Sequence, residues 1–215
     1  MLTASHGKNI RPNFDILMIT FQNLNNQYPY LKLKEKYDEA IQCNQELIEA
    51  ISVSSFSHVK NEVDSRFVNL KFINNEEFIF FSNYDSPKSK QFTSHDQVSV
   101  LIFWSKINTQ IRIKAKIKKI PGAYSKEYFR NRSQYKNALA ISSKQSEQID
   151  SYESVKIQYE KVLAKEDLTV CPEYWGGFSF TPYSFEFWEG NDSRLNKREV
   201  FELVNGIWIE SILQP

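Results

Sequence analysis

Histidine, cysteine and glycine are scarce in this 215-residue chain, which contains 3 His, 2 Cys and 6 Gly. The two cysteines, Cys43 and Cys171, have no paired spacing, so we expect neither a disulfide framework nor a zinc site, and we expect a cytoplasmic location. The histidines, His6, His58 and His95, have no metal-ligand spacing and no serine elbow beside them. We therefore expect no metal and no histidine-based catalytic triad.

The few glycines also exclude the common phosphate loops. Neither G-x-x-x-x-G-K nor G-x-G-x-x-G occurs, and the only glycine pair is Gly176-Gly177 after Trp175. If the chain binds a phosphorylated cofactor, side chains must hold the phosphate in place of a glycine loop.

Long apolar runs and a strong net charge are missing as well. No run approaches the roughly 20 apolar residues that span a bilayer, and the N-terminus has no apolar signal region. The net charge is +1, from 27 basic and 26 acidic residues. We therefore expect a soluble protein with no membrane or nucleic-acid partner, and any anion site must be local.

Aromatic residues are abundant, at 14% of the chain with 16 Phe and 11 Tyr. These residues favour strands and also line pockets for planar ligands. The length suits one domain. Residues 1–29 have weak periodicity and are expected to form an N-terminal arm, and residues 30–215 are expected to form the domain.

The pattern along the domain predicts helices and strands in turn. Residues 30–50 carry apolar residues at near-helical spacing, which predicts one amphipathic helix. The short runs that follow are β-branched, aromatic or alternating and predict strands: "AISVSSFSHV", "SRFVNLKFI", "EEFIFFSN", "VSVLIFW" and "QIRIKAKIKKI". The last of these alternates apolar residues with Arg112, Lys114, Lys116 and Lys118, so one face should be buried and the other basic and solvated.

Residues 123–166 return to a helical pattern and predict an insertion between strands. A final β region begins after Cys171-Pro172 and includes "WGGFSFTPYSFEFWEG". Asn205-Gly206 lies between two more strand-like runs and predicts a tight hairpin. Together these segments predict an α+β fold in which antiparallel strands form a β-barrel with peripheral helices.

Several cations are candidate phosphate ligands. Arg66 and Lys71 lie five apart on one predicted strand, and Lys88 follows the turn "NYDSP". Tyr128 and Arg132 lie four apart on a predicted helix, so both should project from one face. Guanidinium and ammonium groups suit a phosphate dianion, although each of these residues alone is more often a solvated surface charge.

Seven blocks, in order, resemble the pyridoxamine 5'-phosphate oxidase family: "SRFVNLK", "FFSNYDSPKSKQ", "FWSKINTQIRI", "EYFRNR", "SKQS", "WGGF" and "FEFWEGNDSRLNKR", with the terminal "WIESILQP". The resemblance covers about Ala50 to Pro215. It implies an FMN-binding split β-barrel and a homodimer with the flavin at the subunit interface. It also implies oxidation of pyridoxamine or pyridoxine 5'-phosphate to pyridoxal 5'-phosphate, with O2 as acceptor.

The resemblance also assigns roles to individual residues. Cofactor contacts are expected from Arg66, Lys71, Phe81, Ser82, Lys88, Gln110, Gln145, Ser146, Trp188 and Arg198, with Arg66 and Lys88 on the phosphate side. Substrate contacts are expected from Lys71, Tyr128, Arg132, Lys136, Arg194 and Asn196. Arg194 would lie over the pyridine ring at the flavin face, and Arg194 and Asn196 are the expected catalytic residues.

Four positions depart from the family pattern. Phe81 and Pro87 stand where the family usually has a tyrosine and an arginine, so FMN binding should be weaker. Lys136 replaces a serine at the substrate phosphate, and Asn196 replaces a histidine that meets the substrate. An amide cannot titrate near neutral pH. Two alternatives therefore stay open: a related FMN oxidase with another substrate, as in phenazine biosynthesis, or a non-catalytic protein that binds flavin or pyridoxal phosphate.

Overall fold

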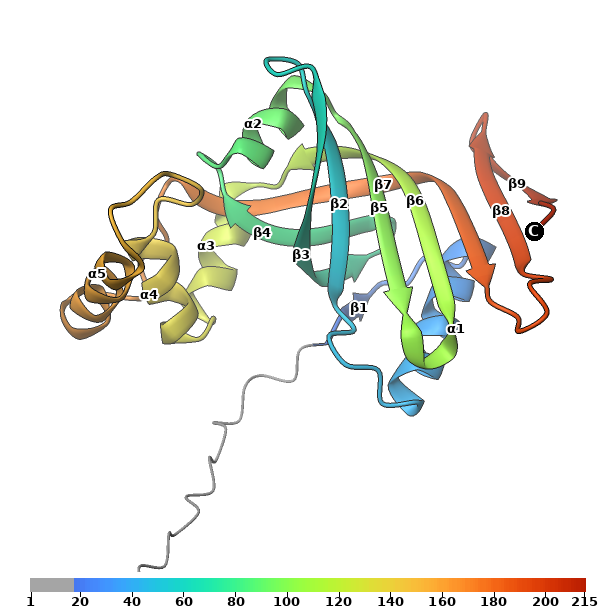
Figure 1. Cartoon of the computed structure of the whole chain (residues 1–215), viewed down its shortest axis with the longest axis horizontal. Coiled ribbons are helices and arrows are strands. Elements are labelled where there is room, and N and C mark those ends of the chain that lie inside the picture. The colour runs from blue at the N-terminus through green and yellow to red at the C-terminus, as the bar shows by residue number, and fades with distance from the viewer. Residues whose placement is uncertain (1–17) are drawn as a thin grey trace, which may run out of the picture.

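The computed structural model describes residues 18–215, which form nine strands and five α-helices (Figure 1). The strands are β1 (Thr20–Gln22), β2 (Ala50–Ser57), β3 (Glu62–Asn74), β4 (Glu77–Asn83), β5 (Gln97–Trp104), β6 (Thr109–Lys119), β7 (Trp175–Glu189), β8 (Lys197–Val204) and β9 (Ile207–Ile212). The helices are α1 (Tyr28–Gln42), α2 (Pro87–Ser94), α3 (Gly122–Arg130), α4 (Gln134–Ser142) and α5 (Tyr152–Lys165), with a 3-10 turn at Ser105–Ile107. The α+β class predicted from the sequence is confirmed.

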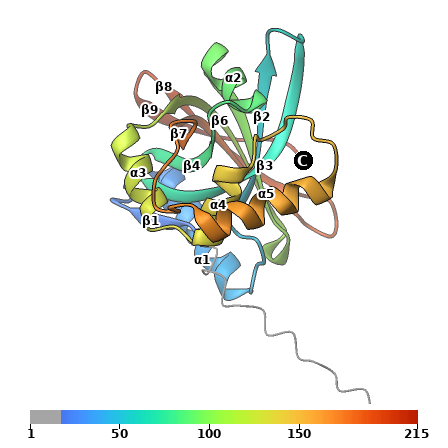
Figure 2. The ribbon, with the colours of Figure 1, turned by 90° about the vertical axis from the view of Figure 1, so that its left-hand side faces the viewer.

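Six of the strands close a ring. The main path of the sheet runs β1-β3-β2-β5-β6-β7-β8-β9, and β4 pairs with both β3 and β7. The pairings therefore return from β7 through β4 to β3, which makes a barrel of β2 to β7, and Figure 2 shows this ring nearly end-on. All pairings in the ring are antiparallel. The β8–β9 hairpin continues from β7 outside the ring.

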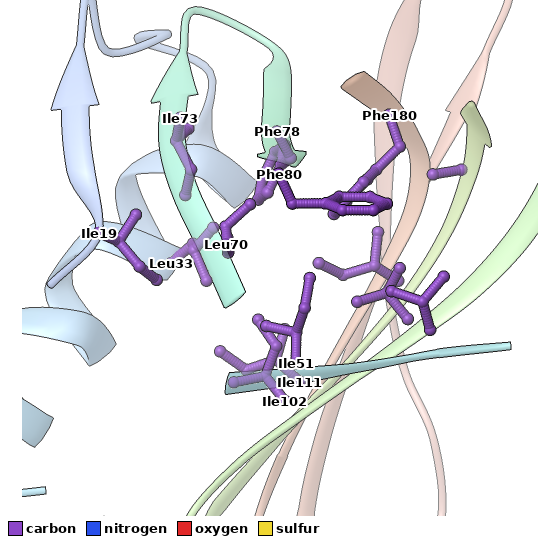
Figure 3. Close-up of a cluster of buried hydrophobic side chains, with 14 of the residues drawn as sticks. Ile19, Leu33, Ile51, Leu70, Ile73, Phe78, Phe80, Ile102, Ile111 and Phe180 are labelled. Atoms are coloured by element: carbon purple, nitrogen blue, oxygen red, sulfur yellow. The ribbon is translucent and has the colours of Figure 1, made fainter. Parts of the chain in front are cut away.

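The inside of the ring is filled by the apolar half of each alternating strand. In β6 the buried residues alternate with the exposed basic ones, as the sequence predicted. Buried side chains from neighbouring strands meet in one cluster that includes Ile51, Leu70, Phe80, Ile102 and Ile111 (Figure 3). Burial of apolar surface on this scale supplies the main driving force for closing the barrel.

Helix α1 covers part of this core but is shorter than predicted. The sequence pattern predicted one helix over residues 30–50, whereas α1 ends at Gln42 and β2 begins at Ala50. Asn44 and Leu47 both have left-handed backbone angles, with φ of 55° and 49°, and such residues end a helix. Ile48 still reaches the core, but it does so from a turn.

Two parts of the fold lie at opposite ends of the molecule. Helices α3, α4 and α5 gather at one end, and the β8–β9 hairpin lies at the other (Figure 1). The helical insertion predicted over residues 123–166 is confirmed by these three helices. The hairpin predicted at Asn205-Gly206 is also confirmed, and both turn residues have positive φ, at 51° and 81°.

The predicted N-terminal arm is only partly described. Residues 18–29 contain β1, which pairs in parallel with β3, and the first two residues of α1. Residues 1–17, including His6, lie outside the described residues. Within residues 18–215, no helix is long and apolar enough to cross a membrane.

The glycine pair of β7 permits close packing. A Cβ atom at Gly176 would lie 2.2 Å from the hydroxyl of Tyr84. That hydroxyl donates a hydrogen bond to the carbonyl of Gly177 at 3.1 Å. The "WGGF" block therefore brings β7 against Tyr84 at the edge of the barrel, as expected where another group approaches a strand backbone closely.

Candidate functional site

A cavity of about 350 Å³ opens between β3, β4 and the helices α3 and α4. Its volume is in the range of small-molecule sites. It brings together eight predicted site residues from distant parts of the sequence: Lys71, Phe81, Ser82, Lys88, Tyr128, Arg132, Lys136 and Gln145. We call this cavity the phosphate pocket.

A second cavity, of about 640 Å³, adjoins the phosphate pocket. It shares Phe67, Lys88 and Gln145 with that pocket and adds Arg66 and Ser146 to the predicted residues that lie together. The two cavities form one groove that passes Lys88. Cations therefore line the groove on both sides of this lysine, with Arg66 in the second cavity and Lys71 and Arg132 in the phosphate pocket.

Lys88 is the most buried cation of the groove, at 9% exposure. Its Nζ donates to Ser86 Oγ at 3.2 Å and to Gln145 Oε1 at 2.7 Å, and both partners are neutral. Burial, and secondarily the charge of Arg66, lowers the pKa of Lys88 to about 8. A buried ammonium without an anionic contact among the described residues is stabilised by a bound anion, so Lys88 fits the phosphate of FMN.

Arg66 points into the groove from β3 and is held by four polar groups. Its Nη1 donates to Ser55 Oγ at 2.7 Å and to the carbonyl of Val53 at 3.2 Å. Its Nη2 donates to Gln91 Oε1 at 2.8 Å and to Asp64 Oδ2 at 2.6 Å. These contacts fix the plane of the guanidinium and use its four terminal N–H groups, so Nε–H is the one N–H group outside them.

Lys71 reaches the phosphate pocket because β3 is irregular there. The pairing of β3 with β4 shifts between Leu70 and Phe72, so Lys71 is the extra residue of a β-bulge. In a regular strand, Arg66 and Lys71 would point to opposite faces because they lie an odd number of residues apart. The bulge changes the direction of the Lys71 side chain. Lys71 and Arg66 therefore line two adjoining cavities.

Arg132 lies outside the helix on which the sequence placed it. Helix α3 ends at Arg130, so the predicted helical face shared by Tyr128 and Arg132 is wrong. Both residues nevertheless line the phosphate pocket. The guanidinium of Arg132 lies 5.1 Å from the ring centre of Trp175, and its Nη1 donates to Asn137 Oδ1 at 3.3 Å. Burial lowers the pKa of Arg132.

Parallel aromatic rings form one wall of the phosphate pocket. Phe81 stacks on Tyr128 with ring centres 3.9 Å apart and planes 9° apart, and it lies 5.2 Å from Trp175 at 5°. Such offset stacks favour flat, apolar faces. Phe81 stands where the family usually has a tyrosine. Its ring packs against the ring of Tyr128 and carries no hydroxyl.

Five predicted residues lie elsewhere and line none of the cavities described here among residues 18–215: Gln110, Trp188, Arg194, Asn196 and Arg198. Gln110 on β6 pairs with Trp188 on β7, which pairs with Arg198 on β8. These three residues form a row across the outer face of the sheet. Trp188 comes thirteen residues after Trp175 on β7, about 40 Å along an extended strand.

Arg194 and Asn196 lie in the loop between β7 and β8. Arg194 is exposed and has a left-handed backbone, with φ of 63°, which is uncommon for a residue with a side chain. Asn191 accepts hydrogen bonds from the backbone and hydroxyl of Ser193, and Asn196 Oδ1 accepts one from the backbone of Asn191 at 3.1 Å. Asn196 therefore helps to close the loop that presents Arg194.

Sequence reasoning missed several residues of the phosphate pocket. Phe67, Asn69, Asn83 and Trp175 line it without having been assigned a role. Trp175 stood in the quoted "WGGF" block, so its position was visible, whereas nothing in the sequence indicated that Arg132 would lie over its ring. Asn137, which holds Arg132, carried no signal because a lone asparagine in a helix has no distinctive pattern.

The histidines His58 and His95 do not line the phosphate pocket, but His58 lines the second cavity of the groove. His58 and His95 lie together beside Phe56, with imidazole ring centres 5.5 Å apart. Among the described residues, no group of three or more His, Cys, Asp or Glu side chains could hold a metal ion.

Comparisons with known proteins agree with the residue blocks. Residues 35–166 match the family model described as pyridoxamine 5'-phosphate oxidase, and residues 175–215 match the model of the pyridoxine 5'-phosphate oxidase C-terminal dimerisation region. A pyridoxine/pyridoxamine 5'-phosphate oxidase from Hydrogenovibrio crunogenus is 33% identical over 171 residues, which is 79% of this chain and 79% of the relative.

Two solved structures have a similar fold. The structure of PhzG from Burkholderia lata, in complex with tetrahydrophenazine-1-carboxylic acid, has a TM-score of 0.81 at 22% identity and covers 87% of this chain and 92% of its own. A pyridoxamine 5'-phosphate oxidase-related, FMN binding protein from Nostoc punctiforme has a TM-score of 0.72 at 9% identity and covers 88% and 99%. At these low sequence identities, the structural similarity supports the barrel fold alone.

Proposed function

The chain belongs to the pyridoxamine 5'-phosphate oxidase family and is an FMN-dependent oxidoreductase, and on this basis we propose that it oxidises pyridoxamine or pyridoxine 5'-phosphate to pyridoxal 5'-phosphate with O2 as acceptor. One observation carries the proposal: a continuous groove presents Lys88 and Arg66 for one phosphate ester and Lys71, Arg132 and Lys136 for another. A cofactor and a substrate that each carry a phosphate require two such sites.

Bound FMN supplies the redox chemistry, by accepting a hydride equivalent from the carbon that bears the amine or alcohol. The residues of this chain bind and orient. Lys71, Arg132 and Lys136 hold the substrate phosphate, with the Tyr128 hydroxyl beside them, and the parallel rings of Phe81 and Tyr128 limit the width of the pocket. Fixed positions of this kind lower the entropic part of the barrier.

We propose that a second copy of the chain brings the predicted residues outside the groove to the site. Gln110, Trp188 and Arg198 share the outer face of the sheet with Phe103, which pairs with Gln110 and is 54% exposed. Farther along the same face, Leu101 and Phe67 flank Ser52 and are 40% and 75% exposed. An apolar surface that reaches from these residues to the edge of the groove suits a twofold contact.

The matched dimerisation region, residues 175–215, contains Trp188, Arg194 and Arg198. In a homodimer that uses this face, each copy would complete its partner's groove with those residues, and FMN would lie at the interface. Arg194 would then orient the pyridine ring of the substrate. We place the reaction in the cytoplasm because Cys43 and Cys171 are free thiols, and Cys43 is exposed.

Oxygen uptake tests the proposal directly. We expect FMN-loaded protein to consume O2 and to form an aldehyde and hydrogen peroxide when it is given pyridoxine 5'-phosphate.

An Arg132→Lys variant should raise the KM about tenfold or more with a small change in kcat, because it loses bidentate donation and the contact with Trp175. Arg130→Lys is the matched control, since Arg130 is an exposed residue two positions away.

A related FMN oxidase with a different substrate is the second candidate function, and one specific observation favours it. Asn196 stands where the family has a histidine, and its side-chain oxygen is engaged by the backbone of Asn191. A substrate that needs a titratable group at this position would turn over slowly. Protein that binds FMN but leaves pyridoxine 5'-phosphate unoxidised, and whose Asn196→His variant gains no activity, would favour a related oxidase with a different substrate.

A further inference from the structure

The carboxylate of Glu186 lies between two guanidinium groups on the outer face of the sheet. Its Oε1 accepts from Arg198 Nε at 2.9 Å and lies 2.8 Å from Arg198 Nη2, and its Oε2 accepts from Arg112 Nη1 at 2.8 Å. Glu186 pairs with Arg112 across β6 and β7, and it lies two residues before Trp188, so both side chains share one face of β7. Glu186 and Arg112 therefore adjoin two predicted flavin contacts, Trp188 and Arg198.

The donors of Arg198 are largely committed by this arrangement. Nη1 donates to the carbonyl of Gln214 at 3.1 Å, and the backbone of Leu213 donates to the carbonyl of Arg198. A guanidinium has five N–H groups. The contacts with Glu186 and Gln214 leave one N–H free on each terminal nitrogen, and both directions are fixed by the carboxylate and the C-terminal segment.

Arg198 and Lys88 differ in how their charges are balanced. Glu186 is 12% exposed and Arg198 is 25% exposed, whereas Arg112 is 53% exposed and its charge is screened by water. The carboxylate therefore neutralises mainly Arg198. Lys88, by contrast, has only neutral hydrogen-bond partners among the described residues.

We propose that Glu186 is a positioning residue that orients Arg198 and balances its charge, so that the nearly neutral Glu186–Arg198 pair presents directed hydrogen-bond donors to the flavin ring, while Lys88 meets the phosphate with its charge unbalanced. The inference rests on the proposed function, because it requires FMN to lie against Trp188 and Arg198. It adds Glu186, to which the sequence assigned no role, to the residues that act on the flavin.

The test compares Glu186→Gln with Glu202→Gln in full-length protein. Glu202 is an exposed carboxylate on β8 and is the matched control. We expect Glu186→Gln to bind FMN about tenfold more weakly, measured by quenching of flavin fluorescence, because a charge-assisted contact that orients Arg198 is lost. We also expect a more positive midpoint potential for the bound flavin, since an uncancelled guanidinium favours the anionic reduced form. Glu202→Gln should change neither quantity.

A double-mutant cycle separates positioning from general damage. In an Arg198→Gln background, Glu186→Gln should have no further effect on the midpoint potential, because its action passes through Arg198. If Glu186→Gln does not fold, Glu186→Asp keeps the negative charge but shortens the side chain, which withdraws the carboxylate from Arg198 Nε and should also weaken FMN binding.

The outcomes distinguish this inference from the function on which it rests. Wild-type protein that takes up no FMN would contradict the proposed function. Wild-type protein that binds FMN, together with a Glu186→Gln variant of unchanged affinity and unchanged potential, would contradict only the role of Glu186. An unchanged affinity and an unchanged potential in Glu186→Asp would contradict it equally.

Discussion

Lys88 offers a pH-dependent signature at the scale of a single residue. Its pKa is lowered to about 8 by burial and by Arg66, so its charged fraction falls through the mildly alkaline range. A phosphate dianion binds the protonated form. FMN affinity should therefore be nearly constant between about pH 6, where the phosphate itself titrates, and about pH 7, and it should fall as the pH rises through about 8, by up to roughly tenfold per pH unit. Fluorescence titrations across the range measure this directly.

Two variants control the experiment. Lys88→Met should bind FMN more weakly and with a flatter pH profile, because the titrating group is gone. Lys161→Met removes an exposed lysine of α5 that lines none of the cavities described above, and it should keep the wild-type profile. An FMN affinity in wild-type protein that does not change between about one unit below and one unit above the pKa would show that Lys88 does not hold the phosphate.

At this scale, the sequence identified the cations but could not determine their contacts. Arg66, Lys71, Lys88 and Arg132 were recognisable by residue type and family blocks, and the structure gathers all four along one groove. The bulge that turns Lys71 into the pocket depends on how β3 pairs with β4, which a single strand pattern does not encode. The carboxylate between Arg112 and Arg198 likewise depends on the register of three strands.

At the scale of elements, Asn137 joins three segments around the phosphate pocket. It is 1% exposed, and its Nδ2 donates to the carbonyls of Phe129 and Leu168 at 2.8 Å each. Asn137→Leu keeps a similar volume but leaves both carbonyls without this donor. We expect the free energy of unfolding to fall by about 2 kcal/mol or more, measured by urea denaturation.

The control for this variant is Gln134→Leu, which changes an exposed residue at the start of the same helix. It should leave the urea midpoint nearly unchanged. If Asn137→Leu is as stable as the wild-type protein, the link between α3, α4 and the segment at Leu168 contributes little to folding.

The strands were predicted better than the first helix, for a physical reason. Alternation in β2 and β6 reports which face is buried, and β-branched residues add to the same signal. The apolar residues keep a helical spacing in the sequence from Gln42 to Ala50. The helix itself ends at Gln42, because Asn44 and Leu47 adopt left-handed backbone angles. Apolar spacing does not reveal where the backbone turns.

At the scale of the whole molecule, the two groups of site residues make a complementation test possible. One variant, Arg132→Ala, damages the groove, and another, Arg194→Ala, damages the loop between β7 and β8. If each site takes one group from each copy, both homodimers are impaired, but a mixed dimer contains one intact site. Random mixing of the two chains should restore about a quarter of the wild-type activity per site.

Oxygen uptake after co-expression of the two variants measures this recovery, and each variant expressed alone is the baseline. Co-expressed protein with no more activity than the two separate variants would indicate that both groups of residues serve the same copy or that Arg194 lies outside the site. The family blocks could identify both groups, but the length of β7 between Trp175 and Trp188 became evident only in the fold.

If two copies share each site as proposed, the length of β7 also makes catalysis depend on the protein concentration. β7 starts at the wall of the groove and reaches Trp188 near its other end, so in the proposed arrangement an isolated copy would hold two incomplete halves of a site. Under mass action, the fraction of assembled pairs falls on dilution, and turnover per chain falls with it. A newly made chain would thus release no hydrogen peroxide until it had met a second copy.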